Sequence, residues 1–306
     1  MEIPQSCYIH IFNEAKEVSN NPNWKENQED NVCLLSHRLM EEMNLGESSR
    51  YAPYIAYLQT QKVGQLPVNW SKEGKDLLQK VLVPGSDGVD WMDVYFKGGC
   101  IDGDNTFEVH MMEMTVQRHF DTALIPIWDM VNHDNGRFNT EINSIYDEGG
   151  VKVHASGVIR AGEEILATYD MCADCGDHAE ENGTPEILRD FGFVEAYPHR
   201  WYFEEGDIWF VVKEEGAAGH RVHWVPEGTE YHFDFDVEDV LFLQRELDRL
   251  LEVGMNDDLL EYTGRLPLHE WRVIIDYYTA AKTDLRLAME KLIIEMNTAL
   301  SPPESF

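Results

Sequence analysis

The spacing of apolar residues predicts helices in the first third of the chain. Within residues 28–120, apolar side chains recur every three to four positions at two places, as on one face of a helix. The first stripe consists of Val32, Leu35, Leu39 and Met43, and the second of Leu77, Leu78, Val81 and Leu82. Gly46 follows the first stripe as a stop signal, and the Gly/Asp-rich stretch 97–105 is expected to be a loop.

The pattern changes to a period of two over residues 121–212, which predicts short strands. The apolar run Leu124–Val131 predicts a buried strand that ends in a loop. Farther on, residues 142–146 and 151–155 flank the turn Asp147-Glu-Gly-Gly150. We interpret this arrangement as a β-hairpin.

The helical period returns in the tail, residues 213–306. Its first stripe consists of Val240, Leu243, Leu247 and Leu250, and its second of Trp271, Ile274, Tyr278, Leu285, Leu292 and Met296. Pro267 suits the start of the last helix. The order of helices, short strands and helices, with no internal repeat, predicts an α+β fold.

Composition narrows the class of protein. A chain of 306 residues with 43% hydrophobic content can bury one large core and a smaller lobe. It has no run of eighteen apolar residues, and its start, Met-Glu-Ile-Pro, lacks the features of a signal peptide. Five cysteines in a chain this long indicate reduced thiols. We therefore expect no membrane span and an intracellular location, with cytoplasm, nucleus and organelle left open.

The chain is strongly acidic, with 24 basic against 57 acidic residues and a net charge of −33. This charge argues against binding to a nucleic-acid backbone. It could steer a basic protein segment towards the molecule, although solubility explains it equally well. The expected partner is a protein substrate, and the oligomeric state is open.

Three blocks of sequence point to a family when they are taken together. They are Ala-Leu-Ile-Pro-Ile-Trp-Asp-Met-Val-Asn-His at 123–133, Ala-Gly-Glu-Glu-Ile-Leu-Ala-Thr-Tyr-Asp at 161–170 and Thr-Pro-Glu-Ile-Leu-Arg-Asp-Phe-Gly-Phe-Val at 184–194. In this order they resemble the second half of the SET domain of protein methyltransferases. The group concerned contains Rubisco large-subunit lysine methyltransferase and actin-histidine methyltransferase. The resemblance spans roughly residues 25–297 and is firm at 117–194.

The resemblance implies a SET β-core with a helical insert and a C-terminal helical lobe that binds substrate. Residues 1–24 would be a remnant of the first SET segment and 25–120 the insert. Residues 121–212 would be the core with the cofactor and catalytic motifs, and 213–306 the lobe. The Gly-x-Gly strand that begins the SET core in related enzymes has no match, so the chain is expected to start partway into the domain.

The resemblance also implies S-adenosylmethionine as the methyl donor. By residue type, Asn132 offers amide donors and a carbonyl acceptor, and His133 adds ring nitrogens beside it. Arg118, just upstream, could bind a carboxylate with its guanidinium fork. In the family pattern, Arg118, Asp129, Asn132 and His133 fall on positions that line the cofactor pocket.

Tyr169 is the candidate catalytic residue. It follows the apolar segment Ile165-Leu-Ala-Thr, where a phenol could hold the acceptor nitrogen and orient its lone pair. The resemblance puts the catalytic tyrosine at this position. By itself, Tyr169 is better explained as an amphipathic residue with a hydrogen-bonded hydroxyl, but the flanking blocks favour the catalytic role.

A short helix is predicted after Tyr169. Thr184 is the expected N-cap, Pro185 the first helical residue, and Glu186 a first-turn acid. The helix is expected to stop at Gly192. In related enzymes an aromatic-Gly-Phe triplet, here Phe191-Gly192-Phe193, closes over the cofactor and the substrate channel. Phe191 stands where the Rubisco enzyme's pattern has tyrosine, which leaves the substrate and the number of methyl groups open.

Other residues raise metal-binding alternatives. Cys172, Cys175 and His178 offer three zinc-type ligands where a structural site requires four, so we favour an acidic surface loop. Cys100 or His110 would have to fold back to complete such a site. His119-Phe-Asp121 and His232-Phe-Asp234 each fit half of an iron facial triad, a match that is common by chance. We assign no metal site.

The sequence thus favours an S-adenosylmethionine-dependent protein-lysine N-methyltransferase. Phe120 and Phe191 suggest an apolar channel, which would suit the methylene stem of a lysine. A protein-histidine N-methyltransferase is the alternative within the class. The alternative outside it is a catalytically inactive SET protein that acts as a protein-binding module.

Overall fold

The chain folds into two compact units, which are described separately. The computed structural model describes residues 1–12, 28–62, 64–86, 88–169, 183–216, 219–224, 236–255, 262 and 264–299. The first unit comprises Met1–Gln65 and Asp90–Thr168, and the second Leu66–Val89 and Tyr169–Phe306. Of the described residues, 51% are helical and 15% lie in the strands of small sheets, which confirms the expected α+β class.

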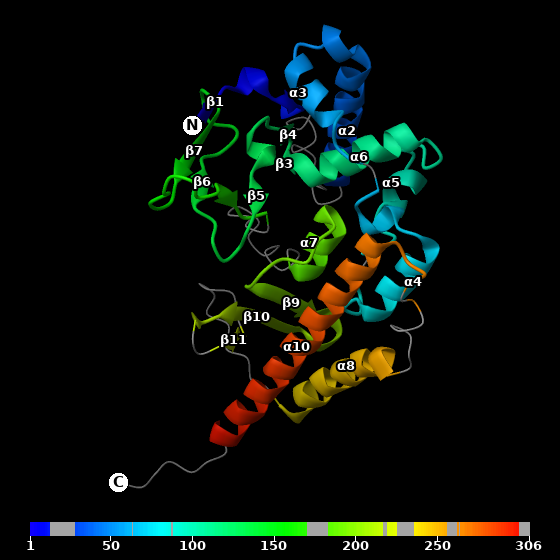
Figure 1. Cartoon of the computed structure of the whole chain (residues 1–306), viewed down its shortest axis with the longest axis vertical. Helices are drawn as coiled ribbons and strands as arrows, with labels where there is room; N and C mark the ends of the chain where they lie inside the picture. The colour runs from blue at the N-terminus through cyan, green and yellow to red at the C-terminus, as the bar shows by residue number, and fades with distance from the viewer. Residues whose placement is uncertain are drawn as a thin grey trace, which may run out of the picture. The chain divides into compact units, whose positions relative to one another are not determined.

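The helices of the first unit include the predicted stripe of Leu35 and Leu39, both fully buried. The helices are α2 (Gln28–Leu45), α3 (Ala52–Leu58), α5 (Asp93–Lys97) and α6 (Thr106–Arg118), with 3-10 turns η1 (Gln5–Cys7), η3 (Gly46–Ser48) and η5 (Trp128–Met130) (Figure 1). Asn105 begins α6 because its side-chain oxygen accepts hydrogen bonds from the Phe107 and Glu108 N–H groups. The loop expected at 97–105 lies between α5 and α6.

Short strands make up the rest of the first unit. They are β1 (Glu2–Ile3), β2 (Ile9–His10), β3 (His119–Phe120), β4 (Ala123–Leu124), β5 (Asn132–His133), β6 (Thr140–Ile142), β7 (Val151–Ala155) and β8 (Leu166–Ala167). In the described residues they form sheets with the orders β1-β7-β6, β2-β4-β3 and β5-β8. The first two sheets are antiparallel, whereas β5 and β8 run parallel.

The predicted hairpin is present with one correction. β6 and β7 pair antiparallel, but β6 ends at Ile142, where the sequence suggested that the first strand begins. The pairing stops because the Asn143 side chain replaces the next backbone hydrogen bonds of the ladder. Its oxygen accepts from the Lys152 N–H, and its amide donates to Asp147, 2.9 Å away. Gly150 lies at φ 96°, and a Cβ there would fall 2.2 Å from the Ile3 carbonyl oxygen. Only glycine fits this position.

The predicted strand over Leu124–Val131 is wrong beyond Leu124. β4 stops there because Pro126 cannot donate a ladder hydrogen bond. Ile127 then adopts φ 76°, and the chain turns into η5 at Trp128. The apolar character of this run reflects burial of its first half, since Leu124 and Ile125 are fully buried whereas Ile127 is half exposed.

The second unit packs helices against a sheet. Its helices are α4 (Lys72–Val81), α7 (Thr184–Phe191), α8 (Val237–Met255) and α10 (Leu268–Ala299), with 3-10 turns η4 (Pro67–Asn69) and η7 (Glu204–Gly206). Its strands are β9 (His199–Phe203), β10 (Ile208–Glu214) and β11 (His220–His223), in the antiparallel order β11-β10-β9. The helices α8 and α10 lie side by side and α4 packs against both (Figure 1).

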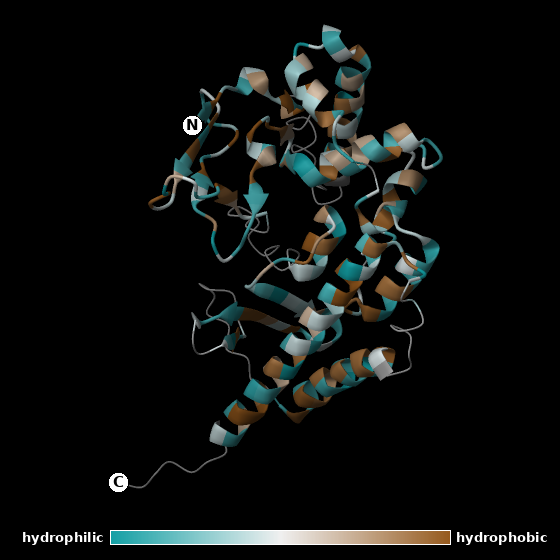
Figure 2. Cartoon of the chain, viewed as in Figure 1, coloured by the Kyte–Doolittle hydropathy of each residue, from teal (hydrophilic) through white to brown (hydrophobic). Residues whose placement is uncertain are grey.

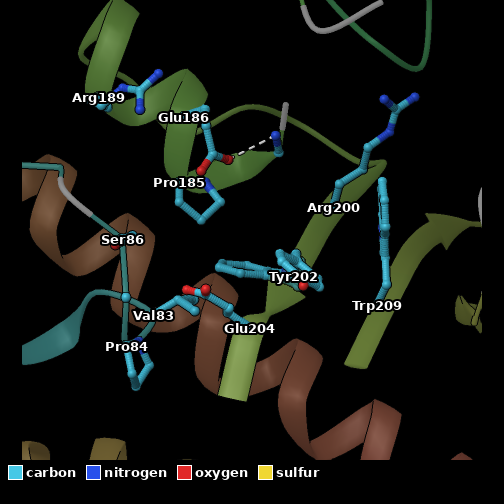
Figure 3. A pocket seen from close by; sticks show the side chains of 13 residues that line it. Val83, Pro84, Ser86, Pro185, Glu186, Arg189, Arg200, Tyr202, Glu204 and Trp209 are labelled. Carbon is cyan, nitrogen blue, oxygen red and sulfur yellow. Dashed lines mark hydrogen bonds between the residues drawn. The ribbon is translucent and has the colours of Figure 1, made fainter. Parts of the chain in front are cut away.

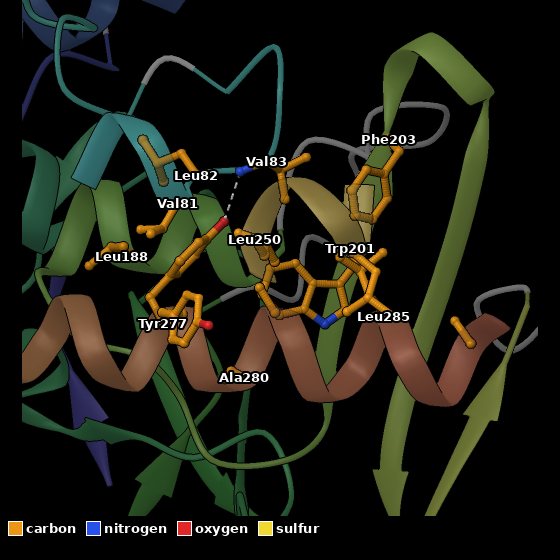
Figure 4. Packing of buried hydrophobic residues seen from close by; sticks show 14 of the residues in the cluster. Val81, Leu82, Val83, Leu188, Trp201, Phe203, Leu250, Tyr277, Ala280 and Leu285 are labelled. Atoms are coloured by element: carbon orange, nitrogen blue, oxygen red, sulfur yellow. Dashed lines mark hydrogen bonds between the residues drawn. The ribbon is translucent and has the colours of Figure 1, made fainter. Parts of the chain in front are cut away.

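The core of the second unit confirms the predicted stripes of α4, α8 and α10. Hydrophobic and hydrophilic residues are interspersed along α10 (Figure 2). The buried hydrophobic residues of α10 belong to one cluster with those of the sheet and of α8. Trp201 of β9 and Tyr277 of α10 are fully buried among them, and the Tyr277 hydroxyl accepts a hydrogen bond from the Val83 N–H (Figure 4). Each such side chain stabilises the fold by roughly 2–3 kcal/mol.

The expectation of reduced thiols is wrong for two of the cysteines. Cys33 of α2 and Cys100, after α5, form a disulfide with their Cα atoms 5.8 Å apart. Sequence alone could not reveal the pair because 67 positions separate them. Cys7 is an exposed free thiol.

The described helices include none that is both long and apolar enough to cross a membrane.

Candidate functional site

Arg118 and Asp129, two candidate cofactor residues, contact each other in the first unit. The Arg118 Nη1 donates to Asp129 Oδ2 at 3.2 Å, and the Tyr54 hydroxyl donates to the same oxygen at 2.7 Å. The Asp129 side chain is only 1% exposed. Burial raises the pKa of this carboxyl group, and the two hydrogen bonds oppose the rise without cancelling it.

The remaining contacts of Arg118 hold its guanidinium in place. Nη2 donates to Gln61 Oε1 at 2.8 Å, and the guanidinium carbon lies 5.5 Å from the centre of the Tyr57 ring. Within the described residues, the Arg118 Nε–H and Asp129 Oδ1 are buried without a hydrogen-bond partner. Buried polar atoms without a partner are costly, so the Arg118 N–H could donate to a bound polar group and Asp129 Oδ1 could accept from one.

Asn132 and His133 form β5, the strand that pairs in parallel with Leu166–Ala167 of β8. Asn132 is exposed, and its amide donates to Glu164 Oε1 at 2.6 Å. His133 is half-buried. The pairing brings the block that ends at His133 beside β8, which lies in the block 161–170.

In the second unit, three candidate residues lie together. The Tyr169 and Phe191 ring centres are 4.6 Å apart, and those of Phe191 and Phe193 are 6.4 Å apart. All three rings are half-buried. Gly192 allows this arrangement because it adopts φ 78° and ends α7, with its N–H bonded to the Leu188 carbonyl at 2.9 Å. The predicted stop at Gly192 is thereby confirmed.

The predicted start of this helix requires a correction. Gly183 is the N-cap residue, and Thr184 is the first residue of α7. The Thr184 hydroxyl does not cap the helix because it donates to Glu195 Oε1 at 2.8 Å and accepts from the Arg200 N–H. Glu186 closes the first turn by accepting the Gly183 N–H at 2.9 Å.

A cavity of about 460 Å³ lies beside this helix start in the second unit (Figure 3). The residues that line it are Val83, Pro84, Gly85, Ser86, Gly183, Pro185, Glu186, Arg189, Arg200, Trp201, Tyr202, Glu204 and Trp209. Burial raises the pKa of the Glu186 carboxyl group to about 7, so this group can hold or release a proton near neutrality. The cavity therefore combines a titrating carboxyl group with guanidinium and aromatic groups.

Sequence reasoning missed this cavity. Arg200 and Tyr202 are two positions apart on β9, a spacing that places them on one face of the strand. No local pattern indicates that the loop Val83–Ser86, more than a hundred positions earlier, closes the same space. Glu186 was recognised in the sequence only as an acidic residue in the first turn of a helix, which does not indicate a cavity.

Sequence reasoning also missed a buried polar network in the second unit. The fully buried Asp284 of α10 accepts hydrogen bonds from His199 Nδ1 at 2.7 Å, Trp201 Nε1 at 2.8 Å and the Tyr197 hydroxyl at 3.2 Å. Burial lowers the pKa of His199, but the hydrogen bond to Asp284 and its charge outweigh burial and raise that pKa overall. The arrangement indicates a structural ion pair that anchors β9 to α10.

The iron-type motif at His119 and Asp121 is not assembled as a site. His119 Nδ1 lies 3.0 Å from the Thr115 carbonyl oxygen, and Asp121 accepts a hydrogen bond from the Tyr146 hydroxyl. The backbone agrees with the simpler interpretation, since α6 ends at Arg118 and feeds the β3–β4 pair.

Other candidate metal ligands either lie outside the described residues or are already bonded to another residue. Cys172, Cys175 and His178 lie outside the described residues, as do His232 and Asp234. Cys100 is bonded to Cys33. Within the described residues, the group that could hold a metal ion is Cys33, His37 and Cys100.

Comparison with known proteins adds no family: no protein-family profile matches this chain, and no curated protein matches it.

Proposed function

We propose that the protein is an S-adenosylmethionine-dependent protein-lysine N-methyltransferase of the SET type. The observation that carries this proposal is the grouping of Tyr169 with Phe191 and Phe193, with 4.6 Å and 6.4 Å between successive rings. These residues come from two of the sequence blocks that resemble the SET methyltransferases. The parallel β5–β8 pair supports the proposal further, because it brings the other block beside the one that contains Tyr169.

The residues present suit the proposed cofactor chemically. The exposed Asn132 amide is bonded to the exposed Glu164 carboxylate, a contact that a ligand's polar groups could replace. The orphaned Arg118 Nε–H and Asp129 Oδ1 offer a buried donor and a buried acceptor. Within the first unit, Asn132, His133, Arg118 and Asp129 would thus hold the polar ends of the cofactor.

The residues around Tyr169 would align and shield the reaction. The bound cofactor supplies an electrophilic methyl group. The Tyr169 hydroxyl would accept a hydrogen bond from the acceptor amine and so direct its lone pair. Phe191 and Phe193 would exclude water from the methylene stem of the lysine. Neither phenylalanine offers the polar group needed to fix an imidazole, which favours lysine over histidine.

The wider assignments are part of the same proposal. The small sheets of the first unit would belong to the SET core, with the helical insert within residues 25–120 and the substrate lobe at 213–306. The net charge of −33 supports a basic segment as the protein substrate. An intracellular location suits such a substrate.

Cofactor binding is the direct test. Isothermal titration of the purified chain with S-adenosylmethionine should give a binding signal, and Asn132→Ala should weaken it by about tenfold or more, as for the loss of one well-made polar contact. Gln244→Ala, which removes a side-chain amide on α8, is the matched control and should leave affinity unchanged. No heat of binding, or equal affinity in Asn132→Ala, would remove the assignment of Asn132.

A methyl-transfer assay distinguishes the lysine methyltransferase from the histidine methyltransferase and from the inactive binding module. Incubation with a labelled methyl donor and basic peptides that each carry one lysine or one histidine should label the lysine peptides. Labelled histidine would support the histidine enzyme. Cofactor binding with no transfer to either peptide set, alongside retention of unmodified basic peptides, would support the inactive binding module.

A further inference from the structure

Three metal-ligating side chains meet in the first unit, outside the residues assigned to methyl transfer. The ligand atoms of Cys33, His37 and Cys100 all lie within 4.8 Å of one another. The two sulfur atoms form a disulfide, and His37 Nε2 lies 2.6 Å from the Cys100 carbonyl oxygen. Each cysteine is half-buried and His37 is exposed.

The backbone positions these three groups. Cys33 and His37 are four residues apart on α2, so their side chains share one face of the helix. Cys100 follows α5 in a loop held by backbone hydrogen bonds, which include Gly98 N–H to Val94 O at 2.8 Å and Cys100 N–H to Tyr95 O at 3.0 Å. The cluster therefore forms from two separately ordered segments.

The ligand set favours a particular kind of metal ion. Two cysteine sulfurs and one imidazole are soft to borderline donors, which suit Zn²⁺ and not Mg²⁺ or Ca²⁺. Zinc–sulfur bonds of about 2.3 Å in tetrahedral geometry place two thiolates about 3.8 Å apart, so the sulfurs would have to move apart to that distance once the disulfide is reduced. Cα atoms 5.8 Å apart allow this separation through side-chain rotation. The exposed His37 ring can turn away from the carbonyl oxygen, and water can supply the fourth ligand.

We propose that Cys33, His37 and Cys100 bind Zn²⁺ when the two cysteines are reduced, and that disulfide formation releases the ion. The two states exclude each other because both use the same two sulfur atoms. Zinc binding requires both thiols to lose their protons to solvent. Helix α2 and the segment after α5 are cross-linked in both states, once covalently and once through the metal.

A small-molecule disulfide, such as oxidised glutathione, can convert the zinc-bound dithiol form into the disulfide form because it takes up the two electrons that the cysteines lose. One protein thiolate attacks the glutathione disulfide and releases one glutathione thiolate, which leaves a mixed disulfide on the protein. The second protein thiolate attacks the protein-bound sulfur, forms the Cys33–Cys100 bond and releases the second glutathione. Two electrons pass from the protein to the oxidant, and Zn²⁺ leaves because neither sulfur carries a negative charge. A reducing intracellular compartment would favour the zinc form.

Zinc titration of the reduced and oxidised protein tests the proposal. The chain carrying Cys172→Ser and Cys175→Ser is the starting protein, so that these cysteines cannot contribute. After reduction with a phosphine and removal of metal, it should bind one equivalent of Zn²⁺ in competition with a chromophoric chelator. After oxidation with glutathione disulfide it should bind none. Failure of the folded, reduced protein to bind zinc, or equal binding after oxidation, would overturn the proposal.

Single variants assign the ligands. Cys33→Ser should abolish binding, whereas Cys7→Ser, which changes an exposed free thiol, should leave it intact. His37→Ala keeps both cysteines and should weaken binding by more than about tenfold, since even outer-shell partners of a zinc site contribute 10–100-fold. Circular dichroism establishes folding in each case. Cobalt substitution should give a thiolate charge-transfer band that disappears in Cys33→Ser. Zinc affinity unaffected by His37→Ala and Cys33→Ser would show that the ion binds elsewhere.

Discussion

The ring of Tyr169 packs against the ring of Phe191 with centroids 4.6 Å apart and planes inclined by 39°. Aromatic pairs at this separation contribute about 0.5–1.5 kcal/mol beyond their buried area. The contact links the orientation of the phenol to the C-terminal end of α7, where Gly192 terminates the helix. The ring that carries the proposed catalytic hydroxyl is thus oriented by the neighbouring helix α7.

Replacing Tyr169 with phenylalanine should keep the fold and the cofactor affinity but remove most of the turnover. The ring contact with Phe191 remains, and only the aligning hydroxyl disappears. Losing one such oriented contact costs about 3–4 kcal/mol, or 10²–10³ in rate. Single-turnover assays and calorimetry measure the two effects. Tyr146→Phe, which removes an exposed hydroxyl bonded to Asp121, is the matched control. An unchanged rate in Tyr169→Phe would transfer the role to another residue.

The pH dependence of the rate should distinguish a lysine acceptor from a histidine acceptor. A lysine must lose a proton before it attacks, which costs roughly 4–5 kcal/mol at pH 7 because its reference pKa is about 10.4. Histidine, with a reference value near 6.5, is mostly neutral at that pH. At subsaturating peptide, the rate should rise steadily from pH 7 to 9 for lysine. A flat profile with methyl-histidine in the digested product would exclude the lysine enzyme.

Asp284→Asn should destabilise the fold by about 3 kcal/mol, because it breaks a buried ion pair while three donors still point at the site. Because the pKa of His199 is raised in the folded state, the stability that this ion pair contributes depends on pH. The contribution is complete below the unfolded value of 6.5 and is lost as pH rises through the higher folded value. In Asp284→Asn the NMR-titrated pKa of His199 should fall and this pH dependence should weaken. Asp276→Asn, an exposed change on the same helix, should alter neither.

Glu186→Gln should stabilise the protein at alkaline pH relative to acid pH. The folded pKa of about 7 exceeds the ordinary 4.5, so the wild type loses stability as pH rises from about 4.5 through 7. Glutamine can still accept the Gly183 N–H but never ionises. Between pH 5 and 8 the difference in unfolding free energy should shift by about 1–3 kcal/mol in favour of the variant, after allowance for solvent screening at the cavity. Urea melts measure it. Glu252→Gln, exposed on α8, should show no such shift.

Gly150→Ala and Gly149→Ala should differ in cost although the two residues are adjacent. Both have positive φ, 96° and 93°, so either alanine introduces backbone strain of about 1–2 kcal/mol. At Gly150 the new Cβ would also meet the Ile3 carbonyl oxygen at 2.2 Å and force β1 away from β7, whereas at Gly149 nothing lies within 4 Å. Thermal melts should therefore rank Gly150→Ala clearly below Gly149→Ala. Equal melting temperatures would contradict the close packing of β1.

Helix positions were the most predictable part of the fold. The stripes at Leu35 and Leu39, at Leu77 and Leu78, and along α8 and α10 each became a buried helix face, because one helix period determines which side chains meet the core. The strand region was less predictable. Very short strands such as β4 and β5 show little periodicity, and a single residue, Pro126, ended the first of them.

Local sequence also predicted the stop at Gly192, since a left-handed glycine ends a helix wherever it occurs. The catalytic role of Tyr169 stays a prediction. Only the tertiary structure decided which distant groups meet. The Cys33–Cys100 bond, the Arg118–Asp129 pair and the three donors around Asp284 join residues that no short-range pattern connects. The physical reason is the range of the forces: helix propensity and capping act over a few residues. Burial and pairing act between whole elements, and they depend on how those elements pack.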